Sequence, residues 1–418
     1  MMTRRQLKTV RTRLERFLAD LTRIMGRSER RHWAGVYVRG LLLDSPPRKT
    51  AAGMARTMEE ADEQALQQLV SGSPWDDDAL RQALGLRMSR ELAARPSWVI
   101  DDTGFPKQGT HSVGVARQYS GTLGKVGNCQ VAVSLHLCTD EASVPLGYAL
   151  YLPEEWAKDA QRRKRAKVPD DVAFKEKWRL ALELIDRAMA GGIAPGVVAA
   201  DAAYGDATEF REEVVRRSLH YMMQASSTLK GWTGPVRPRR RKARSPRGRP
   251  PSRYDYGDAP PPQTVKNVAL ALPKSAWKEV RWREGSRGPM GSRFAATRFQ
   301  PSHGHTQGLA PQPEQWLIVQ WPPDEEAPTK YWLSDLPRNV GLRRLVREAK
   351  ARWRVELDYR ELKDELGMDH YEGRSWAGWH HHVTLTMMAH AFLTLERLRA
   401  KKNSRVGLPK DADPPPGS

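Results

Sequence analysis

The sequence predicts a mixed α/β core that is interrupted by a β-rich insertion and preceded by a helical region. Three observations predict this class. Apolar residues such as Leu14, Leu18 and Leu21 recur at three- and four-residue steps near the N-terminus. Strand-like and helix-like stretches then alternate as far as about residue 225. Short strand-like stretches follow one another from residue 265, and a helical pattern returns at residue 341.

Residues 1–95 are expected to form the helical region. Residues 59–70 and 76–92 continue the helical pattern beyond the first apolar stripe. The second of these stretches opens on three consecutive acids, and a helix N-terminus favours negative charge. The region therefore precedes the sheet as a set of separate helices.

The alternating part of the chain supplies the expected α/β core. Its helices are predicted at residues 172–189 and 209–217, and its strands at residues 98–100, 130–137, 146–152, 197–200 and 219–223. The first strand ends in Asp101 and Asp102, and the strand at 197–200 runs into Asp201. Because functional side chains gather at strand ends in α/β sheets, these acids are the first candidates for chemistry.

The pattern changes after residue 225. Residues 226–263 are rich in Pro, Gly and Arg and predict an irregular segment. Strands are then expected at residues 265–272, 277–283, 293–299, 316–321 and 331–333, helix at 341–399, and disorder at 401–418. The predicted segments are a helical region (1–95), the first part of the core (96–225), the β-rich insertion with a basic loop (226–336), the helical C-terminal part of the core (337–400) and a tail (401–418).

Net charge indicates the class of partner. The 418 residues include 69 Lys and Arg against 49 Asp and Glu, which gives a formal net charge of +20. The basic residues cluster at 4–16, 162–167, 237–253 and 343–354. A single cluster is often just a solvated face, but four clusters favour a long polyanion, most plausibly nucleic acid.

Composition also excludes several classes. A hydrophobic fraction of 39% argues against wholesale disorder. No apolar run approaches the roughly 20 residues that a membrane span needs. Cys129 and Cys138 are the only cysteines, so neither a disulfide framework nor a thiolate zinc site is expected, and a reducing cytoplasm is the expected location.

A third candidate carboxylate lies in the late helical segment. Arg352, Glu356 and Lys363 are spaced four and seven residues apart, which would place them on one face of a continuous helix. Two interpretations are open for this stripe, a surface ion-pair ladder or a carboxylate framed by phosphate-binding cations. For the strand-end acids, the alternative to a functional role is a cap or turn Asp.

Three carboxylates beside a polyanionic partner suit one chemistry. Oxygen ligands bind Mg²⁺ or Mn²⁺, and two such ions promote in-line displacement at a phosphodiester. The triplet His380, His381 and His382 is not expected to hold a metal, because adjacent helical residues point in different directions. Residues 121–125 lack the spacing of a nucleotide-phosphate loop, so no nucleotide cofactor is expected.

Four stretches, at residues 98–107, 114–134, 197–205 and 352–376, carry a family resemblance. The chain resembles the DDE transposases of bacterial insertion sequences, whose catalytic domain has the RNase H-like fold. It is most similar to the cut-and-paste branch with a β-strand insertion and a Tyr-x2-Arg-x3-Glu-x6-Lys signature. The signature Tyr falls on Ala349, and Tyr359 is the candidate to replace it.

The resemblance implies a site. The two metal-binding aspartates would be Asp102, with Asp101 as the adjacent alternative, and Asp201. The glutamate would be Glu356, with Arg352 and Lys363 holding phosphates. Lys125 and Arg117 are further expected DNA contacts. Trp332 in the insertion is a candidate to stack on a displaced base, although a core Trp is the commoner role.

The resemblance also implies a function. The protein would be a Mg²⁺- or Mn²⁺-dependent transposase, holding two ions, in the bacterial cytoplasm and associated with the nucleoid. It would act as a homodimer on double-stranded DNA, cleaving at terminal inverted repeats and joining 3′-hydroxyls to target DNA. Residues 1–95 would bind DNA and dimerise, and the insertion would help to hold the transposon end. The rivals are an RNase H-like nuclease without strand transfer and an inactive DNA-binding descendant of a transposase.

Overall fold

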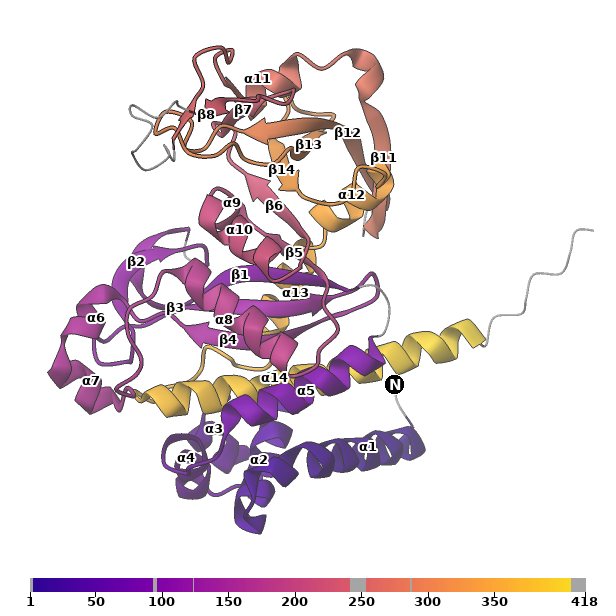
Figure 1. Cartoon of the computed structure of the whole chain (residues 1–418). Helices are drawn as coiled ribbons and strands as arrows, with labels where there is room; N and C mark the ends of the chain where they lie inside the picture. Colours follow the sequence, from indigo (N-terminus) through magenta and orange to yellow (C-terminus); the bar gives the residue numbers. More distant parts are fainter. Residues whose placement is uncertain (1–2, 93–95, 123, 241–252, 286–287, 407–418) are drawn as a thin grey trace, which may run out of the picture. The chain divides into compact units, whose positions relative to one another are not determined.

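A computed structural model describes residues 3–92, 96–122, 124–240, 253–285 and 288–406. The chain is a mixed α/β protein with N-terminal helices and a large mixed sheet, as predicted (Figure 1). It divides into two compact units. The first unit contains Met1–Pro96, Asp102–Ala194 and Arg354–Ser418, and the second contains Ser97–Asp101 and Pro195–Trp353. The five functional segments expected from the sequence remain predictions.

The N-terminal region of the first unit is helical, as expected. Its helices begin at capping residues: Thr3 forms a capping box with Gln6, while Asp62 and Asp76 accept hydrogen bonds from backbone N–H groups three residues ahead. The elements are α1 (Arg4–Thr22), η1 (Arg23–Met25), α2 (Ser28–Leu42), α3 (Ala51–Thr57), α4 (Glu63–Ser71) and α5 (Asp77–Glu91).

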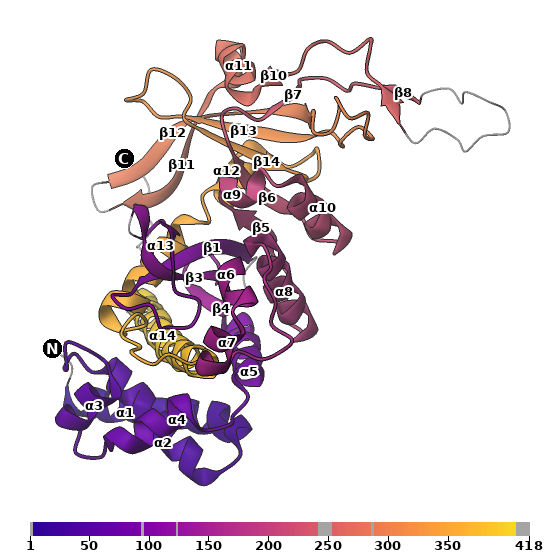
Figure 2. The same ribbon diagram turned by 90° about the vertical axis from the view of Figure 1, so that its left-hand side faces the viewer.

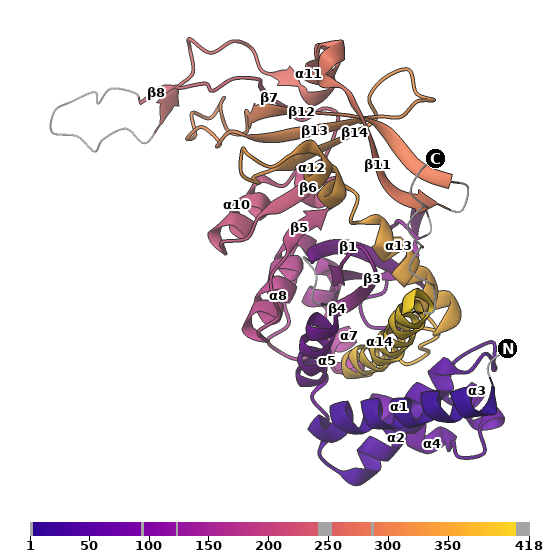
Figure 3. The same ribbon diagram turned by 90° about the vertical axis from the view of Figure 1, so that its right-hand side faces the viewer.

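Helix α14 (Trp376–Val406) is the central helix of the first unit. Residues 378–392 are all buried, which is typical of a helix that is surrounded by its own protein. It packs on α2, α4, α5 and strand β4, and it lies between the N-terminal helices and the strands in Figures 1, 2 and 3. Within the described residues, no helix has the length and apolar character that crossing a membrane would require.

Three consecutive buried histidines of α14 bond to different neighbours. His380 contacts the carbonyl of its own helix at Trp376, and His381 contacts backbone carbonyls before α5. His382 lies between the Tyr37 hydroxyl and the carbonyl of Gly367. The side chains therefore diverge, as predicted. Burial lowers the pKa of both His380 and His382 from 6.5 to about 4.

These lowered pKa values predict a loss of stability in mild acid. Between pH 6.5 and 4 the unfolded chain takes up protons that buried His380 and His382 do not, so the free energy of unfolding falls with pH. A pKa that is lowered from 6.5 to about 4 corresponds to roughly 3 kcal/mol in the free energy of unfolding for each histidine. Urea unfolding at pH 7 and pH 5 measures the effect. We expect His382→Gln to reduce the difference in unfolding free energy between pH 7 and pH 5. His111→Gln, at an exposed residue, should leave this difference unchanged. Equal pH dependence in wild type and both variants would contradict the prediction.

The strands of the first unit centre on β3 (Lys125–Cys138), which pairs antiparallel with β2 (Ala116–Ser120) and β4 (Ser143–Leu150). Strand β1 (Ser97–Pro106) begins in the second unit and ends in the first. Strand β2 was not expected from the sequence. Helices α6 (Glu154–Lys158), α7 (Ala160–Ala166) and α8 (Lys177–Ala190) follow, and α8 packs on β3 and β4.

In the second unit, β1 and β6 (Tyr221–Ala225) pair in parallel with β5 (Val197–Ala200). The sheet continues with antiparallel strands in the order β6-β14-β13-β12-β7-β10, and β11 also pairs with β12. The helices are α9 (Ala202–Gly205), α10 (Thr208–Arg216), α11 (Val265–Leu270), η2 (Lys274–Ala276) and α12 (Leu342–Ala349). The later strands are β7 (Lys230–Trp232), β8 (Arg239–Arg240), β9 (Tyr254–Asp255), β10 (Gln263–Thr264), β11 (Lys278–Gly285), β12 (Gly288–Pro301), β13 (Gln315–Trp321) and β14 (Lys330–Ser334).

The strand predicted at residues 265–272 is wrong, because these residues begin with helix α11. The Thr264 side chain accepts a hydrogen bond from the Asn267 backbone and caps the helix. Val265, Val268 and Ala269 are buried at helical spacing. The other strands expected in the insertion are present, and the irregular segment at 226–263 contains short strands. Most of the basic cluster at 237–253 lies outside the described residues.

Trp332, the candidate for base stacking, belongs to the core of the second unit. It is 4% exposed and packs with Phe294, Ile318 and Val346. The Nζ atom of Lys350 lies 5.2 Å from the Trp332 ring centre, and burial lowers the pKa of this lysine to about 7. In this arrangement Trp332 presents no face to a nucleic acid base.

The late helical segment is less continuous than expected. It contains α12, α13 (Trp353–Arg360), the π-helical turn η3 (Glu361–Glu365) and α14. Residues 366–375 between η3 and α14 are not helical, and Gly367 has a positive φ of 69°. Residues 401–406, which were expected to be disordered, extend α14, and residues 407–418 lie outside the described part of the chain.

Candidate catalytic carboxylates

Strand β1 carries two adjacent acids with different partners. In a strand, successive side chains point to opposite faces. Within the second unit, the Asp101 carboxylate accepts a hydrogen bond of 2.9 Å from the Arg352 guanidinium. Within the first unit, the Asp102 carboxylate accepts one of 2.6 Å from the Lys177 ammonium. The Asp102 side chain is 27% exposed and that of Asp101 only 10%.

Lys177 was not found by sequence reasoning. It is the first residue of α8 and lies 75 positions from Asp102 in the chain. Its ammonium is also 5.8 Å from the ring centre of Tyr151. No motif marked this lysine, because its significance depends on how α8 packs on the sheet.

Asp201 follows β5 directly and caps the short helix α9. Its Oδ1 atom accepts hydrogen bonds from the backbone N–H groups of Ala203 and Tyr204, at 3.0 and 3.4 Å. The structural role considered for this strand-end acid is therefore present. A carboxylate has about four lone-pair positions, so capping is compatible with a second role for the same side chain.

Glu356 lies in the first turn of α13 and is exposed. Arg352 precedes the helix, and Lys363 lies beyond it in the π-helical turn. The three residues therefore do not share one continuous α-helix, and the expected stripe of helical spacing is not formed. The cause is local, since the chain turns before Trp353 and the hydrogen-bond pattern changes after Arg360.

Lys363 links three parts of the first unit. Its ammonium donates hydrogen bonds of 2.7 Å to the Gly104 carbonyl of β1 and 3.1 Å to the Thr122 hydroxyl. The side chain is buried, and burial lowers its pKa to about 8 against the opposing effect of Asp369 and Asp364. Lys363 therefore fastens the turn after β2 to the strand that carries Asp102.

The remaining predicted DNA contacts lie on or against the strands of the first unit. The Tyr359 hydroxyl is 2.6 Å from the Ser134 hydroxyl, and its ring meets His136 edge-on. Arg117 on β2 and Lys125 on β3 are both exposed. The exposed pair is open to a partner in solution, whereas Tyr359 is half-buried.

A buried network surrounds Asp358, two residues after Glu356. The Asp358 carboxylate accepts hydrogen bonds from His136 of β3 at 2.8 Å and from Ser143 of β4 at 2.6 Å. His390 of α14 lies 3.7 Å from the same carboxylate. Burial alone would raise the pKa of Asp358, but the hydrogen bond from His136 and the neighbouring histidines lower it overall. Asp358 thus ties the helix of Glu356 to β3, β4 and α14.

The side chains expected to hold metal supply suitable donors. Asp102, Asp201 and Glu356 offer carboxylate oxygens, which Mg²⁺ and Mn²⁺ prefer. In the part of the chain that the structure describes, no group of three or more His, Cys, Asp or Glu side chains is gathered around a metal position. The fit of these three residues to a divalent cation therefore rests on the chemistry of their carboxylate oxygens.

Comparison with known families decides the class of protein. A family described as "DDE superfamily endonuclease" matches residues 16–289, which is more than half of the 418 residues. The chain belongs to this family. The predicted enzyme class, a DDE endonuclease or transposase, is confirmed, as is the resemblance to DDE proteins of insertion sequences. The matched range of this DDE superfamily endonuclease includes Asp102 and Asp201 and ends before Glu356.

The proteins that are similar to this DDE superfamily endonuclease include a curated relative and a solved structure. A probable transposase for insertion sequence element IS701 from Microchaete diplosiphon is 31% identical over 182 residues. That match covers 43% of this chain and only 45% of the relative's own length. A solved structure, the piggyBac transposase synaptic complex with hairpin DNA, has a TM-score of 0.37 and 10% identity over 93% of this chain and 78% of that one.

Proposed function

We propose that this protein is a DNA transposase that cleaves phosphodiester bonds at the ends of its element and joins the 3′-hydroxyls to target DNA. The observation that carries the proposal is membership of the DDE superfamily endonucleases, in a range that includes Asp102 and Asp201. The partial match to the probable transposase from Microchaete diplosiphon supports it. The catalytic core would be RNase H-like, with the β-rich segment at 226–336 as its insertion.

The proposed site consists of Asp102, Asp201 and Glu356, which would hold two Mg²⁺ or Mn²⁺ ions. Bound there, the ions would activate the attacking oxygen and would stabilise the negative charge that develops on the leaving oxygen of the phosphodiester. Asp102 is favoured over Asp101 because Asp101 is nearly buried beside Arg352. The Lys177 ammonium, which donates a hydrogen bond of 2.6 Å to Asp102, would fix the position of that carboxylate.

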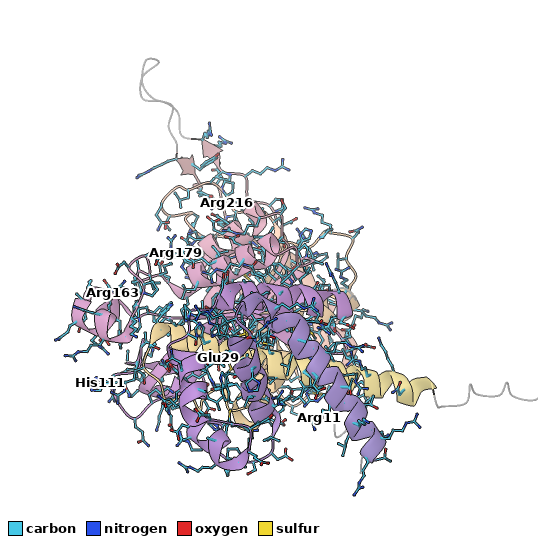
Figure 4. The ribbon with its side chains drawn as sticks, turned by 90° about the horizontal axis from the view of Figure 1, so that it is seen from below. Arg11, Glu29, His111, Arg163, Arg179 and Arg216 are labelled. Atoms are coloured by element: carbon cyan, nitrogen blue, oxygen red, sulfur yellow. The ribbon has the colours of Figure 1, made fainter. Side chains whose placement is uncertain are left out.

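Cations of the chain would hold the DNA backbone. Arg352 and Lys363 would act near the reacting phosphate, with Tyr359 in place of the signature tyrosine missing at Ala349. Helix α1 supports contact with duplex DNA, since five of its basic residues are exposed: Arg4, Arg5, Lys8, Arg11 and Arg16. Arg11 is labelled on this helix in Figure 4. A homodimer would bind the two element ends, and the protein would act in the bacterial cytoplasm at the nucleoid.

A cleavage and joining assay tests the proposal. Purified protein is incubated with DNA that carries the element ends and a target plasmid, in Mg²⁺, Mn²⁺ or EDTA. We expect cleavage and joined products with either metal and neither in EDTA. Cleavage without joining from a 3′-hydroxyl donor would identify a nuclease, the alternative that the endonuclease description of the family favours. DNA binding without any cleavage would identify an inactive descendant.

A further inference from the structure

Strands β2 and β3 form a hairpin with an unusual exposed face. Tyr119 pairs directly with Val126, and Arg117 pairs with Asn128 two residues along. Cross-strand partners, and residues two apart on one strand, share a face of the sheet. Tyr119 is 63% exposed and Val126 51%, which are high values for an aromatic and a branched apolar side chain. The opposite face is covered, since Ser120 and Cys129 are buried.

The turn of this hairpin is fastened to the strand of Asp102. The Thr122 hydroxyl accepts hydrogen bonds from the Lys363 ammonium and from the Gly104 backbone N–H, at 3.1 and 3.3 Å. Gly104 lies two residues after Asp102. A Cβ atom at Gly104 would lie 1.9 Å from the Ser120 hydroxyl oxygen, so only glycine permits this close approach. The hairpin is therefore fastened to the end of β1, within one unit, through its turn and through the covered face that Ser120 lines.

The chain segment that carries this face has basic residues and no acidic ones. No Asp or Glu occurs from Thr103 to Thr139. Arg117 and Lys125 are exposed on the hairpin, and His111, labelled in Figure 4, is exposed in the loop before it. An aromatic ring between cations complements a nucleic acid strand, whose phosphates are anionic and whose bases stack. A protein partner would more often meet a larger apolar patch than these two side chains.

We propose that Arg117, Tyr119 and Val126, named here the hairpin face, bind an unpaired DNA strand together with Lys125 at the turn of the hairpin. The Tyr119 ring stacks on a base, Val126 packs against the same base or its sugar, and the two cations neutralise flanking phosphates. The inference rests on the proposed function and deepens it, because it identifies the form of DNA that this hairpin receives. It assigns base stacking to β2 and not to Trp332 in the insertion.

Binding without divalent metal tests the hairpin face. The full chain in EDTA is titrated into a labelled single-stranded oligonucleotide and into its duplex, and affinity is followed by fluorescence anisotropy. Alanine at a stacking aromatic weakens single-strand binding by about five- to 100-fold. We expect a loss of this size for Tyr119→Ala, little change for Tyr119→Phe, and a much smaller loss on the duplex. Phe174→Ala, at another exposed aromatic of the same unit, should bind normally.

A second readout reports stacking directly. A 2-aminopurine base in the single strand should lose fluorescence when wild type binds, and Tyr119→Ala should abolish this quenching. Arg117→Gln and Lys125→Gln should each lower the slope of log affinity against log salt by about one. Thermal unfolding of each variant confirms folding, since all these side chains are exposed.

Two results would overturn the inference. One is equal single-strand affinity and equal quenching for Tyr119→Ala and Tyr119→Phe. The other is a change in self-association of Tyr119→Ala with unaltered DNA affinity, which would make the hairpin face a protein interface. Because these readouts need no cleavage, a wild type that binds through Tyr119 but never cuts would disprove only the proposed function. A wild type that cuts and joins while Tyr119→Ala binds normally would disprove only the inference.

Discussion

Asp102→Asn, Asp201→Asn and Glu356→Gln are each expected to reduce cleavage at the element end by on the order of a thousandfold or more. Each change keeps the size of the side chain and removes the charge that would hold a divalent cation, an interaction worth several kcal/mol in the transition state. The measurement is the rate of end cleavage in Mg²⁺ at saturating protein. DNA affinity in EDTA should change little, because the cations of the chain are unaltered.

Two matched controls make this result specific. Glu209→Gln changes an exposed carboxylate of α10 and should cleave at the wild-type rate. Asp101→Asn changes the neighbour of Asp102 and should lose stability through its bond to Arg352 while keeping cleavage when folded. Full activity of Asp102→Asn together with an inactive, folded Asp101→Asn would show that the first ligand is Asp101.

Asp358→Ala is expected to lower the free energy of unfolding by roughly 3–5 kcal/mol, because it leaves buried polar groups of β3, β4 and α14 without their carboxylate. Asp358→Asn keeps one side-chain oxygen that can accept hydrogen bonds from these donors, so its free energy of unfolding should fall by less. The exposed Asp364→Ala should be nearly neutral. Chemical denaturation at pH 7 measures all three, and equal stability of Asp358→Ala and Asp364→Ala would contradict the role of the network.

The pH dependence of this effect has a definite sign. The pKa of Asp358 is lowered in the folded protein, so its contribution to stability is present above the unfolded value of 3.8 and is lost as pH falls through the lower folded value. The difference between wild type and Asp358→Ala should therefore be constant near neutral pH and shrink only in strong acid. This window lies below that of His380 and His382.

Local sequence patterns predicted the elements whose signal was unambiguous. The four apolar residues of β5 before Asp201 predicted that strand with its observed bounds. Residues 265–270 were mistaken for a strand because Val265 and Val268 suit both structures, and the cap at Thr264 decides between them. Strand β2 was missed because its five residues lack apolar alternation, and pairing with β3 forms it.

Some residues of the candidate site could likewise be predicted from the sequence, and others could not. Asp102 and Asp201 could be chosen from sequence because each ends an apolar run. Lys177 could not be chosen, since it lies 75 positions from Asp102 in the chain. Nor could His136 and Ser143, which lie more than 200 positions from Asp358. The spacing of Arg352, Glu356 and Lys363 suggested one helical face, and a turn and a π-helical segment change that geometry. Contacts between distant segments set these features, and a single sequence does not display them.

We propose that Asp102, Asp201 and Glu356 together hold the divalent cations. The most direct test is a structure of the protein with Mn²⁺ and an uncleaved DNA end, in which anomalous scattering locates manganese. We predict two manganese peaks bonded to carboxylate oxygens of these three residues, with the scissile phosphate between them. Manganese held by other side chains, or DNA bound in Mn²⁺ with no peak at these carboxylates, would contradict the claim.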